Sequence, residues 1–296
     1  MKVLVTGASG FVGSAVVADL LAHGYEVSGL ARSAGSADKI RRMGAEAVAG
    51  DIAQPQSLRT ATEGVDAIIH TAFNHDFTRF AESCREERAA VAAMGEALRG
   101  SDRPLVITGA AGAVATGSLI TEHDKQPNPN NPRYVSESIA DTLAEEGVRV
   151  AVVRLPPSVH GPGDTHGFIP TLVGLARRKG KLAYIGEGDN VWAAVHRLDA
   201  ARVYRLALEH PGAPGSRWHA VAEGRLPLRD IVARLSDELG LPATSLAKEE
   251  AAAYFENFLH FATLDIPITS DITRDQLGWT PTGATLYEDI SAGVYC

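Results

Sequence analysis

Short apolar runs alternate with longer amphipathic stretches through the first half of the chain. The runs are rich in Val, Ile and Leu and apolar throughout, as is typical of strands covered on both faces of a parallel sheet. Between them, apolar residues recur at helical spacing. We therefore predict a doubly wound α/β domain. The expected strands are 2–6, 26–31, 45–50, 66–71, 104–108 and 148–154, and the expected helices are 11–23, 36–43, 54–63, 78–100 and 132–146.

The pattern changes after Arg154, where the segment LPPSVHGPGDTHG is dense in proline and glycine and favours a loop. A helix near 168–179 and a strand near 181–185 follow. Asp199 then precedes the apolar-periodic run AARVYRLALEH, so we expect it to be the N-cap of a helix. We predict a larger domain of residues 1–157 together with 191–215, and a smaller interleaved lobe of residues 158–190 and 216–296.

The segment VTGASGFVG has the spacing G-x-x-G-x-x-G, directly after an apolar strand and directly before a helix. Glycine permits a tight turn and lets backbone N–H groups approach a pyrophosphate at the helix N-terminus. The strand–loop–helix context distinguishes the motif from an incidental turn. We expect a dinucleotide to contact Gly7, Ser9, Gly10, Phe11, Val12 and Gly13.

The residues after the second predicted strand bear on which dinucleotide binds. About 20 residues past the glycines, an NAD site usually carries an acidic residue for the ribose 2′-hydroxyl. This chain has Arg32 and Ser33 there. A guanidinium matches a phosphate in charge and in the geometry of its donors. We therefore predict that NADP is favoured over NAD. A solvated surface arginine is the alternative interpretation of Arg32.

Further contacts are expected where the third and fourth strands end, because ligands of doubly wound sheets bind at the carboxyl ends of the strands. Asp51 is placed to meet the edge of an adenine ring, with a plain turn residue as the alternative. The other residues that we expect to line the cofactor are Ile52, Thr71, Ala72 and Phe73.

Together these motifs resemble the extended branch of the short-chain dehydrogenase/reductase superfamily, which includes sugar epimerases and dehydratases. VRLPPSVHGPG resembles the family's LRP…NVYGPG, WAAVHRLDAARVYRLALEH its FVHVDDVA, and LGWTPTGATLYEDI its LGW-x-P…L-x-E ending. The resemblance implies a Rossmann-type dinucleotide domain, a smaller lobe that closes over a small-molecule substrate, and a homodimer through the helices at 78–100 and 132–146. It also implies contacts near the nicotinamide from Pro156, Pro157 and Ser158.

The family's catalytic pair is altered in this chain. The family uses a tyrosine with a lysine four residues later, whose charge lowers the pKa of the phenol. In NPRYVSES, one register puts Arg133 and Glu137 in the tyrosine and lysine places, and the other keeps Tyr134 but puts Ser138 in the lysine place. Neither register restores the pair, as in the atypical subgroups that this chain resembles.

Arg133 and Glu137 are four residues apart, so we expect either an ion pair along one helix face or a role in shaping the substrate pocket. Arg133 is not a general acid near neutral pH, because a guanidinium keeps its proton there. Tyr134 is the candidate proton donor, and His160 is an alternative because histidine titrates near neutrality.

The family's catalytic serine also lacks a direct counterpart. The segment ITGAAGAVATG after the fifth strand offers only Thr108 and Thr116 as hydroxyl groups. We therefore retain Thr108 as a candidate catalytic residue. Gly or Ala is expected in the place of the serine itself.

Charge and cysteine content exclude several other classes. The net charge of −8 and pI near 5.7 argue against nucleic acid as a partner. No run approaches the ~20 apolar residues of a membrane span. Cys84 and Cys296 cannot form a disulfide framework, and a reduced, cytoplasmic protein is the simplest interpretation. No metal site is expected, because no pair of histidines has ligand spacing on one helix.

From these observations we predict an NAD(P)-dependent oxidoreductase with an atypical active site. It would transfer hydride to or from a small carbonyl or alcohol. One alternative is an epimerase or dehydratase of the sugar-nucleotide type. The other is a dinucleotide-binding regulator without turnover.

Overall fold

Seven parallel strands form the larger sheet of the computed structural model, which describes residues 1–76, 79–114, 118–125 and 131–296. The strand order is β10-β6-β5-β4-β1-β2-β3, so the direction of winding reverses between β1 and β4. This confirms the predicted doubly wound class. The strands are β1 (Lys2–Thr6), β2 (Glu26–Ala31), β3 (Glu46–Ala49), β4 (Ala67–His70), β5 (Leu105–Ala110), β6 (Val150–Leu155) and β10 (Ser216–His219).

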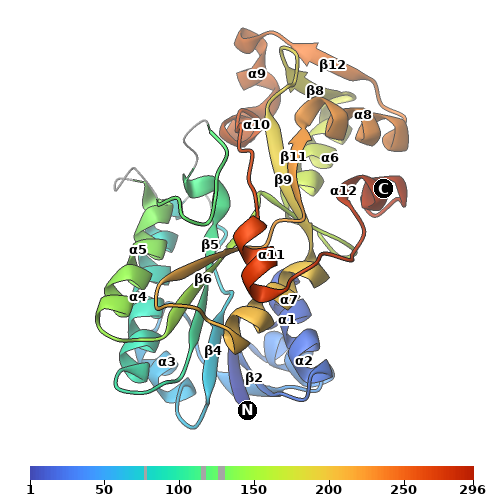
Figure 1. The fold of residues 1–296 in the computed structure, drawn as a ribbon. Coiled ribbons are helices and arrows are strands. Elements are labelled where there is room, and N and C mark those ends of the chain that lie inside the picture. Colours follow the sequence, from blue (N-terminus) through green and yellow to red (C-terminus); the bar gives the residue numbers. More distant parts are fainter. Residues whose placement is uncertain (77–78, 115–117, 126–130) are drawn as a thin grey trace.

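Helices cover both faces of this sheet (Figure 1). On one face, α1 (Phe11–Ala22), α2 (Ala34–Arg42) and α7 (Arg197–Glu209) bury apolar side chains such as Val16, Leu20 and Ile40. On the other face, α3 (Pro55–Ala61), α4 (Phe80–Leu98) and α5 (Pro132–Glu145) form a second core. Because both faces are covered, the strands β1 to β6 are mostly apolar, which is the pattern that predicted them from the sequence.

The smaller lobe lies beyond the carboxyl ends of the large sheet (Figure 1). It contains a three-stranded sheet of β7 (Ser158–His160), β9 (Val191–His196) and β11 (Glu223–Pro227), and a two-stranded sheet of β8 (Leu182–Ile185) and β12 (Ala243–Leu246). Phe168, Trp192 and Phe258 pack edge to face in its core. Its helices are α6 (Phe168–Lys179), α8 (Leu228–Leu239), α9 (Lys248–Phe255), α10 (Leu259–Ala262) and α12 (Leu286–Ser291), with the 3₁₀ turn η3 (Glu256–Phe258).

The boundaries between the two parts differ from those predicted. Residues 191–196 form β9 in the smaller sheet, whereas 216–219 form β10 beside β6 in the large one. The helix α11 (Asp271–Leu277), expected in the lobe, packs on α7 and β10. The chain therefore crosses between the parts several times. Within the described ranges, no helix is both long and apolar enough to traverse a bilayer.

The predicted N-cap of α7 was wrong. The helix begins at Arg197, and the His196 ring nitrogen Nδ1 accepts the hydrogen bond from the Leu198 N–H at 3.3 Å. Asp199 lies in the first turn, is buried, and accepts hydrogen bonds from the backbone N–H groups of Thr282 and Gly283. Its carboxylate also pairs with Arg202 of the same helix. Asp199 therefore fastens the C-terminal segment to α7, a long-range role that local spacing does not reveal.

Replacing Asp199 with alanine should lower the free energy of unfolding by about 3 kcal/mol, because the Thr282 and Gly283 N–H groups and the Arg202 guanidinium lose a buried anionic partner. Urea denaturation measures this loss. Asp230, an exposed first-turn aspartate of α8, is the matched control, and Asp230→Ala should cost less than about 1 kcal/mol. Equal losses in the two variants would contradict the fastening role.

Candidate functional site

A tight glycine turn joins β1 to α1 at the carboxyl edge of the large sheet. Gly7 has a φ of +69°, in the left-handed region that favours glycine, and the Gly10 N–H donates to the Gly7 carbonyl at 2.8 Å. Gly10 is the N-cap of α1 and supplies no side-chain cap. The first N–H groups of α1 therefore have no capping side chain, which is the arrangement that binds phosphate in other proteins.

The turn is packed so closely that side chains are excluded from it. A Cβ on Gly13 would lie 2.1 Å from the Gly7 carbonyl oxygen, and a Cβ on Gly7 would lie 2.8 Å from the Ala72 backbone nitrogen. The turn thus rests directly on the segment after β4. These residues fit a dinucleotide, because the glycines keep side chains out of the turn and no side chain caps the start of α1.

Two threonines and a histidine join the ends of β1 and β4 below the turn. The Thr71 hydroxyl donates to the Thr6 carbonyl at 2.8 Å, and the Thr6 hydroxyl lies 2.7 Å from His70 Nδ1. Burial, helped by the charge of Arg133, lowers the pKa of His70 to about 3, so the ring is neutral. Thr71 therefore has a structural bond beside the cofactor contact that we predicted for it.

Arg32 follows β2 directly and is exposed, and the described part of the chain provides it with no ion pair. The Ser33 hydroxyl caps α2 by accepting the Ser36 N–H at 3.2 Å. One carboxylate oxygen of Asp51 accepts the Ala53 N–H at 3.0 Å, as expected of a turn residue, and the side chain is half-buried. Cofactor contacts of Arg32, Ser33, Asp51 and its neighbour Ile52 stay predictions.

Helix α5 begins with Asn131 as the N-cap and Pro132 in the first turn. The Asn131 side-chain oxygen accepts the Arg133 N–H at 2.9 Å. Tyr134, the next residue, is half-buried. In the register that retains this tyrosine, Ser138 stands in the lysine place, and it lies toward Arg88 of α4. The role of Tyr134 as proton donor stays a prediction.

Arg133 does not pair with Glu137, so the predicted ion pair along one helix face was wrong. Its guanidinium forms an ion pair with Glu87, a buried residue of α4, and lies 4.4 Å from the centre of the Phe73 ring. Phe73 follows β4 and was predicted to line the cofactor. The pairing therefore holds a cation at the carboxyl edge of the sheet, beside the segment that would face the nicotinamide.

Glu137 lies in a buried ionic network between α5, β6 and β10. It accepts hydrogen bonds from Arg154 at 2.6 Å and from Arg217 at 3.2 Å, and Arg217 also pairs with Asp141. Burial by itself would raise the pKa of Glu137, but the hydrogen bonds and charges of the two arginines outweigh it and hold the pKa below its ordinary value. Glu137 is thus a structural anion in the lysine place.

The structure gives Thr108 a position at odds with its predicted catalytic role. Its hydroxyl donates to the His70 carbonyl at 2.8 Å and lies 2.7 Å from the hydroxyl of Tyr204 in α7. These contacts fasten β5 to β4 and to α7. The 3₁₀ turn η2 (Ala111–Val114) follows β5, and the residue in the place of the family's serine stays a prediction. Thr116 lies outside the described residues.

His160 is likewise at odds with a catalytic role, because its ring is fully buried. Its Nδ1 lies 2.6 Å from Asp289 of α12. Burial lowers the pKa of His160, and the bond to Asp289 opposes this shift only in part. The pair connects β7 to α12. Ahead of it, Pro156, Pro157 and Ser158 follow the end of β6, where their predicted cofactor contact stays untested.

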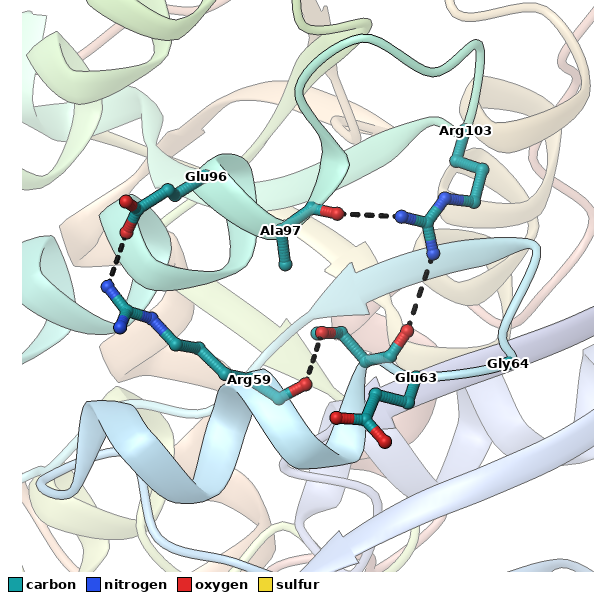
Figure 2. A pocket seen from close by; sticks show the side chains of 7 residues that line it. Arg59, Glu63, Gly64, Glu96, Ala97 and Arg103 are labelled. Carbon is teal, nitrogen blue, oxygen red and sulfur yellow. Dashed lines mark hydrogen bonds and ion pairs between the residues drawn. The ribbon is translucent and has the colours of Figure 1, made fainter.

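Two surface hollows lie at the opposite, amino edge of the large sheet. Figure 2 shows the first, between the ends of α3 and α4, where Arg59 pairs with Glu96 and Arg103 donates to the Ala97 carbonyl at 2.6 Å. Arg103 also donates to the Val65 carbonyl at 3.1 Å. Its donors are committed to backbone carbonyls and to the Ser101 hydroxyl, so this hollow joins secondary-structure ends and is remote from the glycine turn.

The strand order and the glycine turn are those of doubly wound proteins that bind a nucleotide at the carboxyl edge of the sheet. The chain belongs to the NAD dependent epimerase/dehydratase family, whose model matches residues 3–219. The family resemblance predicted from the sequence is therefore confirmed.

Full-length relatives occur in two yeasts. An uncharacterized protein of Schizosaccharomyces pombe is 42% identical over 296 residues, covering 100% of both chains. An uncharacterized protein of Saccharomyces cerevisiae is 40% identical over 295 residues, covering 99% of this chain and 98% of its own. The 2-alkyl-3-oxoalkanoate reductase of Stenotrophomonas maltophilia is 29% identical over 278 residues, covering 86% of this chain and 80% of its own.

Solved structures share the fold at lower identity. The dTDP-glucose 4,6-dehydratase of Bacillus anthracis, in complex with NAD, superposes with a TM-score of 0.77 at 19% identity, covering 99% of this chain and 95% of its own. The UDP-glucose 4-epimerase of Thermus thermophilus, also with NAD, gives 0.76 at 21% identity, covering 99% and 98%. These likenesses confirm the Rossmann-type architecture.

Replacing Glu137 with glutamine should lower the free energy of unfolding at pH 7 by about 3 kcal/mol, because Arg154 keeps no buried anion. A carboxyl whose pKa is lowered by folding stabilises the protein above its unfolded pKa, and this contribution is lost as the pH falls through the folded pKa. The difference in the free energy of unfolding between wild type and Glu137→Gln should therefore become smaller below about pH 4.3.

Urea denaturation between pH 3 and pH 8 tests the Glu137 network. The control is Glu96→Gln, which breaks the exposed pair with Arg59 and should cost less than about 1 kcal/mol at any pH. If Glu137→Gln lowers the free energy of unfolding by the same amount at every pH, the charge of the carboxylate does not account for the stabilisation.

Proposed function

We propose that the protein is an NAD(P)-dependent oxidoreductase that transfers hydride to or from a small carbonyl or alcohol substrate. The observation that carries the proposal is the glycine turn, in which Gly7 and Gly13 exclude side chains and leave the first turn of α1 uncapped. The family assignment supports NAD(P) dependence at the level of the class. The bound dinucleotide would supply the hydride.

NADP is the favoured cofactor in this proposal. Arg32 is exposed at the end of β2, and no acidic residue stands beside it in the segment from Ala31 to Gly35. A 2′-phosphate there would meet an unpaired guanidinium and the N-terminus of α2, both of which favour negative charge.

The chain supplies a cation where the family has its tyrosine. Arg133 is fixed between Glu87 and the Phe73 ring, so it can donate hydrogen bonds to a substrate oxygen on which negative charge develops. It keeps its own proton, and we assign the proton donation to Tyr134, which follows it in α5. Reduction suits this arrangement better than oxidation, because no lysine stands four residues after Tyr134 to stabilise the phenolate that an oxidation would use as its base.

Reduction is also the direction named for some relatives. The Stenotrophomonas relative is a 2-alkyl-3-oxoalkanoate reductase. Aldehydes, ketones and 3-oxo acids are therefore the first substrates to test. A sugar-nucleotide epimerase or dehydratase is disfavoured, because the tyrosine–lysine pair on which those enzymes rely is replaced by Arg133 and Glu137.

A dinucleotide-binding protein without turnover is the second candidate. It is favoured by the ionic pairing of both altered positions, since Arg133 binds Glu87 and Glu137 binds Arg154. These ion pairs stabilise the fold whether or not the protein catalyses a reaction. The homodimer through α4 and α5 implied by the family resemblance belongs to either proposal, and sedimentation velocity tests it.

Arg32→Asp should reverse the cofactor preference, because the variant repels a 2′-phosphate and its carboxylate can accept from a ribose 2′-hydroxyl. Isothermal titration calorimetry should show NADP+ binding weakened at least tenfold and NAD+ binding unchanged or tighter. Arg41→Gln, on the exposed face of α2, is the control for the loss of one charge and should leave both affinities unchanged. A wild-type preference for NAD+ would refute the argument from Arg32.

NADPH consumption across the panel of aldehydes, ketones and 3-oxo acids separates the enzyme from the binding protein. For a substrate that is turned over, Tyr134→Phe should lower kcat about 100-fold through loss of the proton donor. Arg133→Gln should lower kcat/KM by a similar factor through loss of the fixed cation. Turnover unaffected by Tyr134→Phe would remove the phenol from the mechanism. Dinucleotide binding without oxidation of NADPH by any member of the panel would favour the second candidate.

A further inference from the structure

Arg197, the first residue of α7, lies against the start of α1. Its guanidinium carbon is 4.7 Å from the centre of the Phe11 ring, and its Nη2 donates to the Ser14 hydroxyl at 3.1 Å. Phe11 is the first helical residue after the glycine turn. The α7 cation is thus held beside the part of the backbone that would face a pyrophosphate.

A glycine-rich segment of the smaller lobe borders the same side chain. Arg197 Nη1 donates to the Pro162 carbonyl at 3.1 Å. A Cβ on Gly161 would lie 3.2 Å from the Cγ of Arg197 and 2.8 Å from the His196 ring, and Gly161 has a φ of +131°. The close approach of this segment restricts the aliphatic part of the Arg197 side chain around Cγ. The guanidinium is consequently positioned before any ligand arrives.

Arg197 differs in its charge balance from several other half-buried or buried arginines, although Arg103 and Arg274 likewise have no carboxylate partner among the described residues. Arg154 pairs with Glu137, Arg205 with Asp19, and Arg217 with Asp141, whereas no carboxylate of the described residues pairs with Arg197. Its Nε is buried and has no hydrogen-bond partner among those residues. Burial also lowers the pKa of the guanidinium, and no acidic neighbour opposes that shift. The Nε of Arg103 and the Nε of Arg274 each donate to a serine hydroxyl, so the buried Nε without a partner distinguishes Arg197.

We propose that Arg197 binds the pyrophosphate of the dinucleotide and supplies the positive charge that the glycine turn itself lacks. This inference rests on the proposed function, since it presumes a dinucleotide at the α1 start. Two effects would then act on the same phosphates, the partial positive charge of the helix N-terminus and a full guanidinium charge. Stacking on Phe11 keeps the guanidinium in place, so little side-chain entropy is lost on binding.

The position of Arg197 also implies a link between the two parts of the molecule. One guanidinium nitrogen contacts the α1 start and another contacts Pro162, which follows β7 in the smaller lobe. A bound pyrophosphate would therefore contact a side chain that is already hydrogen-bonded to the smaller lobe.

Calorimetric titration of Arg197→Gln with NADP+, NAD+ and ADP-ribose tests the proposal. All three ligands contain the pyrophosphate, and a charge-assisted hydrogen bond to it corresponds to about a tenfold change in affinity. We expect all three dissociation constants to rise by a common factor of about ten. Arg41→Gln is the matched control for the loss of one positive charge and should leave them unchanged.

Two results would overturn the assignment of Arg197. Unchanged affinities in Arg197→Gln would show that the residue only fastens the Pro162 segment to α1. If only NADP+ binds more weakly to Arg197→Gln, the cation lies at the 2′-phosphate. If NADP+ and NAD+ bind more weakly but ADP-ribose binds with unchanged affinity, the cation lies at the nicotinamide end.

Failure of the proposed function would look different, because the wild-type protein itself would then bind none of the three ligands. Should Arg197→Gln not fold, as judged by circular dichroism and thermal melting, Arg197→Lys decides the question. Lysine keeps the charge but loses the planar donor fork and the stacking, so all three dissociation constants should rise about threefold. Unchanged constants in Arg197→Lys would then overturn the proposal.

Discussion

The carboxyl edge of the large sheet depends on how closely Gly13 approaches the Gly7 carbonyl. With 2.1 Å between that oxygen and an imagined Cβ, no other residue fits at Gly13 without moving α1 away from β1. The same turn rests on Ala72, so the segment after β4 is placed by it as well. The uncapped start of α1 and the neighbouring ends of β1 and β4 follow from this one contact, and the proposed dinucleotide site consists of them.

Buried ion pairs occupy the places where a catalytic tyrosine and lysine are expected. Glu87 holds Arg133 from α4, and Arg154 and Arg217 hold Glu137 from β6 and β10. Arg133 and Glu137 therefore each have a partner of opposite sign, as the low polarisability of a protein interior demands. The two residues therefore have different roles. Glu137 stabilises the packing of α5 on the sheet, whereas Arg133 lies beside Phe73 at the carboxyl edge of the sheet, where we propose that it meets a substrate oxygen.

The smaller lobe is joined to the larger domain by side chains at the start of α7. Asp199 binds the N–H groups of Thr282 and Gly283, and Arg197 binds the Pro162 carbonyl while it stacks on Phe11. Two neighbouring residues of one helical turn thus fasten segments from both parts of the molecule.

The sequence by itself determined the class of fold, the glycine turn and the family, because these depend on local spacing. The strands at 2–6 and 26–31 were predicted to the residue, since their apolar runs end at turns. Partners distant in the chain could not be predicted: Arg133 with Glu87, Glu137 with Arg154, and Asp199 with Gly283 each join elements far apart. The tertiary structure alone decided these contacts. A charged side chain can pair with any opposite charge that folding brings near, and helical spacing restricts only its neighbours on the same helix.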